Sequence, residues 1–168
     1  LLSLQQGLDV ARNGGPGSAT SVFMRGTNSN HVLVLIDGMR VGSSFSGAFT
    51  WENVPISQIE RIEIVRGTRV SYYGSDAIGG VVNLQTPANA ELQAELEYGS
   101  FNTLNGSATL GHVYESTGST VSATLSGYKT DGVDTSDRGG EKDGSDSLSA
   151  LLTSSTRLGE AASLSGLA

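Results

Sequence analysis

SYYGSDAIGGVVNLQT, residues 71–86, is a polar stretch that runs into an apolar strand. Its acid, Asp76, is surrounded by three glycines, Gly74, Gly79 and Gly80. Such a stretch is either a catalytic turn or a joint between two structural units. The catalytic interpretation is weak, because the chain's histidines, His31 and His112, lie on separate predicted strands and complete no triad. We therefore expect a joint, with a different architecture on each side of it.

Before the joint, residues 1–87 contain short, mixed elements and predict an α+β unit with a small mixed sheet. The leucine spacing over residues 1–8 indicates the end of an amphipathic helix with Gly7 as its C-cap. Pro55 suits the first turn of a helix, and the residues after it alternate as in a strand. Strands are predicted within the ranges 21–26, 31–38, 39–42, 55–67 and 79–86.

After the joint, residues 88–168 contain five segments that alternate apolar with small polar side chains. Each has the length of a tilted membrane-spanning strand, roughly 9–11 residues. Alternation alone fits a soluble sheet as well as a transmembrane barrel, because both have one apolar face. Five strands do not close a barrel, whose smallest bacterial examples use about eight, so a barrel here would need further strands.

Composition excludes several classes of protein. A formal net charge of −7 argues against nucleic acid as a partner, because phosphate binding needs a basic surface. The absence of cysteine excludes disulfides and thiolate metal sites. No run of about 18 apolar residues is present, so no transmembrane helix is predicted.

Two longer stretches carry a family resemblance. SVFMRGTNSNHVLVLIDGMRV (residues 21–41) and VPISQIERIEIVRGTRVSYYGSDAIGGVVNLQT (residues 54–86) resemble the plug domain of TonB-dependent outer-membrane receptors. The resemblance implies that residues 1–87 form the plug and that residues 88–168 are the first antiparallel transmembrane strands of a barrel of about 22 strands. It also implies that the TonB box lies before residue 1 and that the rest of the barrel follows residue 168.

The same resemblance implies a function without covalent chemistry. Family members sit in the bacterial outer membrane, in contact with its lipid, and import scarce large ligands with energy supplied by TonB. NGGPGSATSVFMRGTNSNHVLVLIDG (residues 13–38) and GYKTDGVD (residues 127–134) are most similar to cobalamin receptors. The expected ligand is therefore cobalamin or a ferric siderophore. In the stretch that closes the plug, the glycines around Asp76 would allow tight turns and close backbone approach, and Asp76 would cap a turn.

Two loops of the predicted plug are candidates for ligand contact, because in the family the apical plug loops touch the substrate. The alternative is that both are simply flexible turns. The loop at 42–50 matches the cobalamin-receptor pattern less well than the loop at 13–21. The candidate ligand-binding residues are Asn13, Gly14, Ser18, Ser43, Ser44, Phe45 and Ser46.

Two arginines each precede a glycine at the end of a predicted strand. The resemblance matches Arg25 and Arg66 to plug arginines that pair with glutamates of the barrel wall, which would lock the plug in place. The alternative is two solvated arginines. Within the plug, Glu63 is a candidate partner for Arg61.

An acidic, glycine-rich loop over residues 130–147 holds six carboxylates. Hard oxygen ligands clustered in this way suit Ca²⁺, although the spacing does not fit an EF-hand. Cobalamin receptors bind calcium in an extracellular loop of this region, and the residues that match best are Asp134, Asp143 and Asp146. Arg138 and Lys142 weaken the match, and a solvated hairpin loop is the alternative.

Two other functions compete with the receptor. One is a soluble α+β enzyme in which Asp37, at the end of the strand in residues 31–38, is the catalytic acid. Against it, Asp37 and Gly38 form a hairpin signal, and no other catalytic group has a supporting spacing. The other is an outer-membrane β-barrel without transport, which would have the alternating strands but not the plug motifs. We expect no enzyme activity and no cofactor other than the calcium of the acidic loop.

Overall fold

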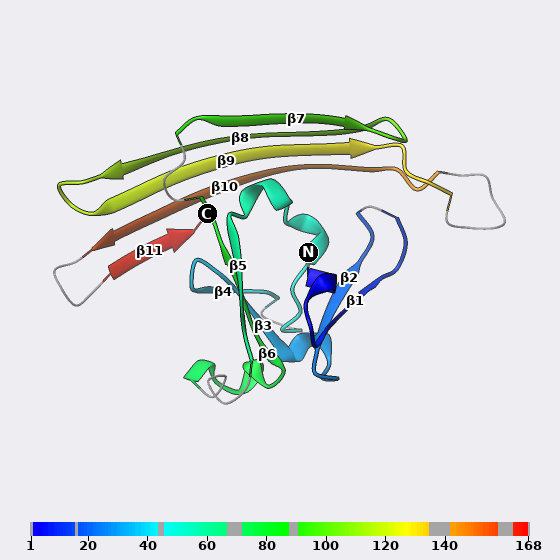
Figure 1. Cartoon of the computed structure of the whole chain (residues 1–168), viewed down its shortest axis with the longest axis horizontal. Helices are drawn as coiled ribbons and strands as arrows, with labels where there is room; N and C mark the ends of the chain where they lie inside the picture. Colours follow the sequence, from blue (N-terminus) through cyan, green and yellow to red (C-terminus); the bar gives the residue numbers. More distant parts are fainter. Residues whose placement is uncertain are drawn as a thin grey trace. The chain divides into compact units, whose positions relative to one another are not determined.

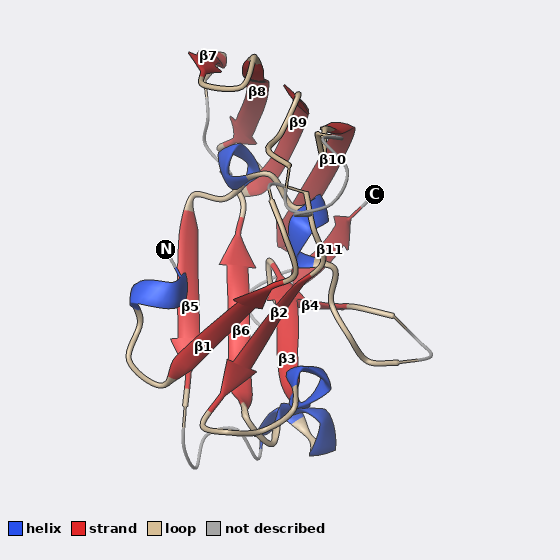
Figure 2. Ribbon diagram, turned by 90° about the vertical axis from the view of Figure 1, so that its right-hand side faces the viewer, coloured by secondary structure: helices blue, strands red, loops and turns tan. Residues whose placement is uncertain are grey.

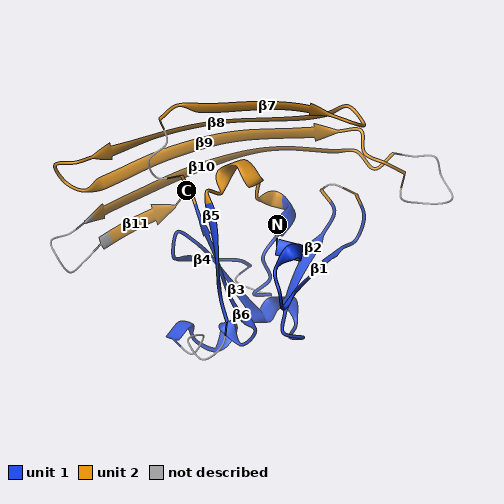
Figure 3. Cartoon of the chain, in the orientation of Figure 1, with its two compact units in different colours: residues 1–14, 18–52, 61–85 blue, residues 15–17, 53–60, 86–168 orange. Residues whose placement is uncertain are grey.

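A computed structural model describes residues 2–15, 17–43, 46–66, 72–87, 91–134, 142–157 and 163–167. The chain divides into two compact units (Figure 3). The first unit comprises Leu1–Gly14, Ser18–Glu52 and Arg61–Gln85, and the second comprises Gly15–Gly17, Asn53–Glu60 and Thr86–Ala168. Among the described residues, no helix is long and apolar enough to cross a membrane. The boundary predicted after residue 87 stays a prediction.

The first unit is built from a hairpin and a four-stranded sheet (Figures 1 and 2). The sheet has the order β4-β3-β6-β5, in which β3 and β6 are parallel and the other pairs are antiparallel, so the predicted mixed sheet is confirmed. β1 and β2 form the separate antiparallel hairpin. The strands are β1 (Leu8–Arg12), β2 (Thr20–Met24), β3 (Val32–Ile36), β4 (Met39–Val41), β5 (Arg61–Val65) and β6 (Gly80–Gln85).

The helical part of the chain consists, in the described residues, of short 3₁₀ turns. They are η1 (Leu2–Leu4), η2 (Ser29–His31), η3 (Trp51–Asn53), η4 (Ile56–Gln58) and η6 (Ser75–Ala77). Pro55 is the N-cap of η4, in accord with its predicted place at a helical first turn. The amphipathic helix expected over residues 1–8 is wrong at its C-terminal end, because Gly7 at φ 77° turns the chain and Leu8 begins β1.

The core of the first unit is centred on β3, whose residues are all buried. A strand buried on both faces reads as a continuous apolar run rather than an alternation, which is what VLVLI shows. Leu33 and Leu35 pack with Ala77 and Val81 on one face of the sheet. The turn from β3 to β4 is formed by Asp37 and Gly38, both with positive φ (49° and 80°), as a two-residue I′ hairpin requires.

Gly79 and Gly80 serve close packing inside the first unit. A Cβ on Gly80 would overlap the Sδ atom of Met24 and lie 2.9 Å from the carbonyl oxygen of Val65. A Cβ on Gly79 would overlap the Oγ1 atom of Thr27, and the Gly79 amide donates to the His31 carbonyl at 2.9 Å. The sequence indicated close backbone approach to a surrounding wall, whereas the neighbours that exclude side chains here belong to the same unit.

The second unit contains an antiparallel five-stranded sheet in the order β11-β10-β9-β8-β7, so sequential strands are neighbours throughout (Figure 1). Ala108 of β8 lies opposite Leu125 of β9, which lies opposite Ala150 of β10. The five alternating segments predicted from the sequence are therefore strands. They are β7 (Gln93–Gly99), β8 (Thr103–Tyr114), β9 (Ser119–Thr130), β10 (Ser145–Arg157) and β11 (Ser163–Leu167).

Candidate functional site

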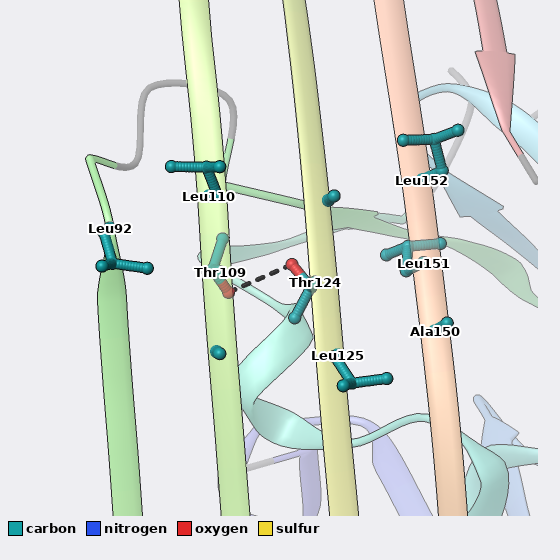
Figure 4. A pocket seen from close by; sticks show the side chains of 10 residues that line it. Leu92, Thr109, Leu110, Thr124, Leu125, Ala150, Leu151 and Leu152 are labelled. Atoms are coloured by element: carbon teal, nitrogen blue, oxygen red, sulfur yellow. Dashed lines mark hydrogen bonds between the residues drawn. The ribbon is translucent and has the colours of Figure 1, made fainter.

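One face of the five-stranded sheet is apolar and exposed. Leu96 is 76 % exposed and Leu125 is 53 % exposed, although both lie within regular strands. Small residues leave a hollow in this face, with a volume of about 390 Å³ (Figure 4). Its lining includes Ala108, Ala123 and Ala150 with Leu92, Leu110, Leu125 and Leu152. A face of this kind lacks the polar cover that a sheet facing water has.

The opposite face of the same sheet is covered with hydroxyl groups that bond in pairs across the strands. Thr109 and Thr124, which are buried, lie opposite each other with their Oγ1 atoms 3.1 Å apart (Figure 4). Further pairs on this face join Ser122 to Thr153 at 2.6 Å and Thr103 to Thr130 at 2.8 Å. A polar face opposite an apolar exposed face is the arrangement of a transmembrane barrel strand, with its lumen side hydroxyl-lined.

The first candidate ligand loop joins β1 to β2. The Asn13 amide donates to the Ala19 carbonyl at 3.1 Å, which closes the loop, and Asn13 is exposed. Gly14 lies so close to Ser18 that a Cβ there would be 2.6 Å from the Ser18 Oγ. The structure thus brings Asn13, Gly14 and Ser18 together as small polar groups at one turn, while their role in ligand binding stays a prediction.

The second candidate loop follows β4. The Ser43 Oγ accepts from the Ser46 amide at 3.2 Å, and the Ser43 carbonyl accepts from the Gly47 amide at 2.8 Å, so Ser43 and Ser46 share a tight turn. Ser44 and Phe45 lie outside the described residues. The ligand role of this loop also stays a prediction.

The described ends of the acidic loop are closely packed. The Asp143 amide donates to the Val133 carbonyl at 3.1 Å, and a Cβ on Gly132 would overlap the Asp143 carbonyl oxygen. Only glycine at position 132 allows the two arms to approach in this way. One further acid, Asp131, accepts at 2.6 Å from the Asn102 side chain of the β7–β8 turn.

The three proposed calcium ligands occupy different places in this loop. Asp134 and Asp143 lie at its two described ends, whereas Asp146 is in β10, directly opposite Lys129 of β9. Across the described part of the chain, no group of three or more potential ligands is placed to hold a metal ion. The calcium site stays a prediction.

The joint itself carries an ion pair that the sequence did not indicate. Asp76 is paired with Arg40 of β4 and also accepts from the Ser75 hydroxyl at 3.2 Å. The hydrogen bond and the charge of Arg40, with the Ser75 hydroxyl, lower the pKa of the Asp76 carboxyl below its ordinary value. The expectation that Asp76 caps the turn is not met, because η6 has Gly74 at its N-cap with no side-chain cap bond.

Comparison with known families identifies this arrangement. The family described as TonB-dependent Receptor Plug Domain matches residues 1–81. Residues 1–81 are therefore similar in sequence to the plug domain of TonB-dependent receptors. The plug family match includes residues 53–60, which the compact second unit also contains.

Relatives of the plug and the strands after it are transporters and receptors. The vitamin B12 transporter BtuB of Vibrio cholerae is 46 % identical over 93 residues, which are 55 % of this chain and 15 % of that protein. BtuB of Vibrio vulnificus is 45 % identical over 103 residues, 60 % of this chain and 17 % of that protein. The chain thus spans about a sixth of the length of these relatives.

Solved structures of siderophore receptors have the same fold. A ferric enterobactin receptor (PfeA) variant from Pseudomonas aeruginosa in complex with enterobactin is 25 % identical, with a TM-score of 0.63 over 90 % of this chain and 27 % of that chain. The siderophore receptor PirA from Acinetobacter baumannii is 20 % identical with a TM-score of 0.63, and shows the fold alone. Both matches cover 90 % of this chain, so the shared fold includes the alternating strands as well as residues 1–81.

The arginines of the predicted plug lock are exposed. Arg25 follows β2 at φ 55°, with its amide donating to the Gly7 carbonyl at 3.1 Å, and Arg66 follows β5. Their pairing with glutamates of the barrel wall stays a prediction. The local pair suggested for this part of the plug is present, because Arg61 bonds to Glu63.

Sequence reasoning missed Gln58, which is 6 % exposed. Its side chain donates to the hydroxyls of Ser126 in β9 and Ser149 in β10. The available signal was the glutamine of PISQI (residues 55–59), a polar residue between Ile56 and Ile59 in the turn that begins with Pro55. That pattern does not identify partners so far along the chain.

Proposed function

We propose that this protein is part of an outer-membrane receptor that imports a scarce, large ligand, with cobalamin as the first candidate and TonB as the energy source. One observation carries the proposal: a plug family match is followed in the same chain by strands with an exposed apolar face and a hydroxyl-lined face. An apolar outward band suits contact with outer-membrane lipid, and a polar inner face suits a water-filled lumen. Localisation in the bacterial outer membrane follows from the same reasoning.

The higher sequence identity to vitamin B12 transporters favours cobalamin over a ferric siderophore as the ligand. The relatives at 45–46 % identity are vitamin B12 transporters, whereas the ferric enterobactin receptor is 25 % identical. The loops with Asn13, Gly14, Ser18, Ser43 and Ser46 offer hydroxyls and backbone amides, which bind a neutral polar ligand by hydrogen bonds. No bond of the ligand is made or broken, so binding and release are the whole chemistry, and the named relatives fit a protein that is not an enzyme.

The energy coupling needs a segment outside the described structure. We propose that a TonB box adds as a strand to TonB, a mode in which main-chain hydrogen bonds supply the affinity. The plug arginines Arg25 and Arg66 would form ion pairs with wall glutamates in the resting receptor. Such pairs gain strength where they are partly shielded from water.

Uptake in cells tests this function. The full reading frame is expressed in a bacterium that lacks its own cobalamin receptor, and uptake of labelled cyanocobalamin is measured with and without TonB. We expect uptake that requires TonB and saturates with ligand. Binding of ferric enterobactin without binding of cyanocobalamin would assign the siderophore class instead, and binding of neither would overturn both ligand assignments.

The acidic loop is proposed to bind calcium when the receptor binds its ligand. Bringing Asp134, Asp143 and Asp146 together costs Coulomb energy unless a cation neutralises them, and a bound cation would preorganise the loop. Ligand affinity of the full receptor is measured with calcium and with chelator. The doubly substituted Asp143→Asn, Asp146→Asn protein should lose the calcium effect, and Asp9→Asn, at an exposed acid in β1, should keep it. Equal affinities in calcium and chelator for the unsubstituted receptor would show that the loop is only solvated.

A further inference from the structure

Gln58 is a buried polar residue. Its segment lies within the plug family match, yet it clusters with the compact unit that contains the five-stranded sheet. Residues Asn53–Glu60 cluster with the five-stranded sheet, and η4 lies against β9 (Figure 3). Within η4 the chain is held by short-range bonds, since the Gln58 amide donates to the Pro55 carbonyl at 3.0 Å. The side chain of Gln58 connects this turn to the strands.

Three polar atoms form a triangle at this point. The Gln58 Nε2 is 3.0 Å from the Ser126 Oγ and 2.9 Å from the Ser149 Oγ, and the two serine oxygens are 2.9 Å apart. Ser126 is 2 % exposed, so water does not take the place of a missing partner at this atom. All three edges of the triangle have the length of a hydrogen bond, and each edge needs one proton.

Counting protons fixes which way the carboxamide faces. The Nε2 group supplies two protons, one to each serine, and either hydroxyl supplies the third for the Ser126–Ser149 edge. With the carboxamide reversed, its oxygen would accept from both hydroxyls, and no proton would remain between the serines. The reversed arrangement leaves two oxygens in contact without a proton, so the amide nitrogen must face the strands.

We infer that Gln58 is a positioning residue whose two amide protons anchor residues 53–60 on the hydroxyl face of β9 and β10. In the proposed receptor this anchor holds a plug segment to the strands before the ligand arrives, so its role in uptake rests on the proposed function, although its geometry does not. Other hydroxyls on this face bond to one another in pairs, and in the part of the chain that the structure describes Gln58 joins one such pair from outside the sheet.

The neighbouring residue shows that the contact is specific to Gln58. The Ser57 hydroxyl is buried and, among the described residues, has no hydrogen-bond partner. An unsatisfied hydroxyl contributes no anchoring, so Ser57→Ala should leave the segment as firmly held as before. Ser57→Ala is thus a control for substitution in the same turn.

Amide hydrogen exchange of residues 56–60, measured in the protein expressed from its full reading frame, tests the anchor. Gln58→Glu keeps the size of the side chain but replaces two donors by a carboxylate that only accepts. We expect exchange to accelerate about tenfold or more at pH 7, since removing a partner leaves buried polar groups unsatisfied. Gln58→Met, which has no donor, should show the same acceleration, while Ser57→Ala and Ser122→Ala, at a hydroxyl bonded to Thr153, should not.

Lowering the pH separates the proton count from simple packing. A carboxyl buried at this place titrates above its ordinary range, and when protonated it regains a donor, so the triangle again has a proton for each edge. Relative to the unsubstituted protein at the same pH, Gln58→Glu should recover its protection at mildly acidic pH and Gln58→Met should not. The anchor would be overturned if Gln58→Glu exchanged its amide hydrogens at the unsubstituted rate at pH 7, or if the two variants exchanged at equal rates at every pH. None of these outcomes depends on uptake, so a failure to import cobalamin leaves this test intact.

Discussion

The two sheets of this chain use similar apolar residues in opposite ways. In the first unit, the apolar strand β3 is buried along its whole length. In the second unit, leucines such as Leu96 and Leu125 are exposed, while threonines and serines such as Thr124 and Ser126 are buried. The hydrophobic effect places apolar groups away from water in both cases only if the second sheet has a solvent other than water on its apolar face. A leucine that is exposed on the chain can therefore still be shielded from water by a membrane, so burial by the protein and burial by lipid are measured in separate experiments.

The largest effect is expected from Leu35→Asp, which attacks the core of the first unit. Leu35 is 6 % exposed and packs with Leu33, Ala77 and Val81, so a carboxylate there would be desolvated without a partner. We expect a loss of more than about 4 kcal/mol, enough to unfold the unit. Thermal melting and circular dichroism check the result, with Leu4→Asp, at an exposed leucine, as the control. An unchanged melting curve for Leu35→Asp would refute the assignment of this core.

Leu125→Arg tests the solvent of the second sheet. In lipid, an arginine on the outward face of a barrel strand costs about 2–4 kcal/mol near the bilayer midplane, whereas in water the same exposed position would tolerate it. The control is Ser147→Arg, on the hydroxyl face of β10, where the charge would meet a polar lumen. Unfolding in denaturant from a lipid bilayer gives both values. Equal losses of stability for the two variants would show that the two faces of the second sheet do not meet different solvents.

Gly80→Ala compares packing density in the two units. The new Cβ would overlap Met24 and lie 2.9 Å from the Val65 carbonyl oxygen, and we expect a loss of about 1–3 kcal/mol from overpacking. Gly99→Ala in β7 is the matched change, because its nearest neighbour would be Thr103 at 3.8 Å. Denaturant midpoints check the pair. A Gly80→Ala protein as stable as Gly99→Ala would mean that the first unit is less closely packed than the structure shows.

The smallest effect is expected at the joint. The pKa of Asp76 is lowered by Arg40, so this pair stabilises the folded state above the ordinary pKa of an aspartate, about 3.9, and the contribution is lost as the pH falls through the lower folded-state pKa. Arg40→Ala should raise the pKa of Asp76 towards its ordinary value and move that loss to higher pH. A carbon-detected NMR titration of Asp76 measures the shift. Arg61→Ala, which removes the partner of Glu63 instead, should leave the titration of Asp76 in place.

Local sequence signals predicted most of the fold. Alternation located the strands of the second unit, and Asp37–Gly38 predicted a hairpin turn that both residues adopt with positive φ. The helix expected over residues 1–8 failed because leucine spacing over two turns is short evidence, and Gly7 turns the chain into β1 instead of ending a helix.

Contacts between residues far apart in the chain could not be predicted from the sequence. Gln58 bonds to hydroxyls 68 and 91 residues away, and Arg40 bonds to a carboxylate 36 residues away. Serines and threonines on alternating positions indicated a polar face, but the pairing of each hydroxyl depends on the register between strands. Which polar residue is buried with a partner follows from that register, and a single sequence does not specify it.

The parallel pairing of β3 with β6 sets an order of events during folding. β3 meets β4 at once, through a two-residue turn, but its other neighbour begins only at Gly80, which pairs with Val32. The five apolar residues of β3 therefore keep one open edge until the segment between Asp37 and Gly80 has folded back onto this strand. An apolar strand with an open edge is the template on which chains aggregate. Until β6 pairs with β3, the folding chain is therefore open to aggregation through the free edge of β3.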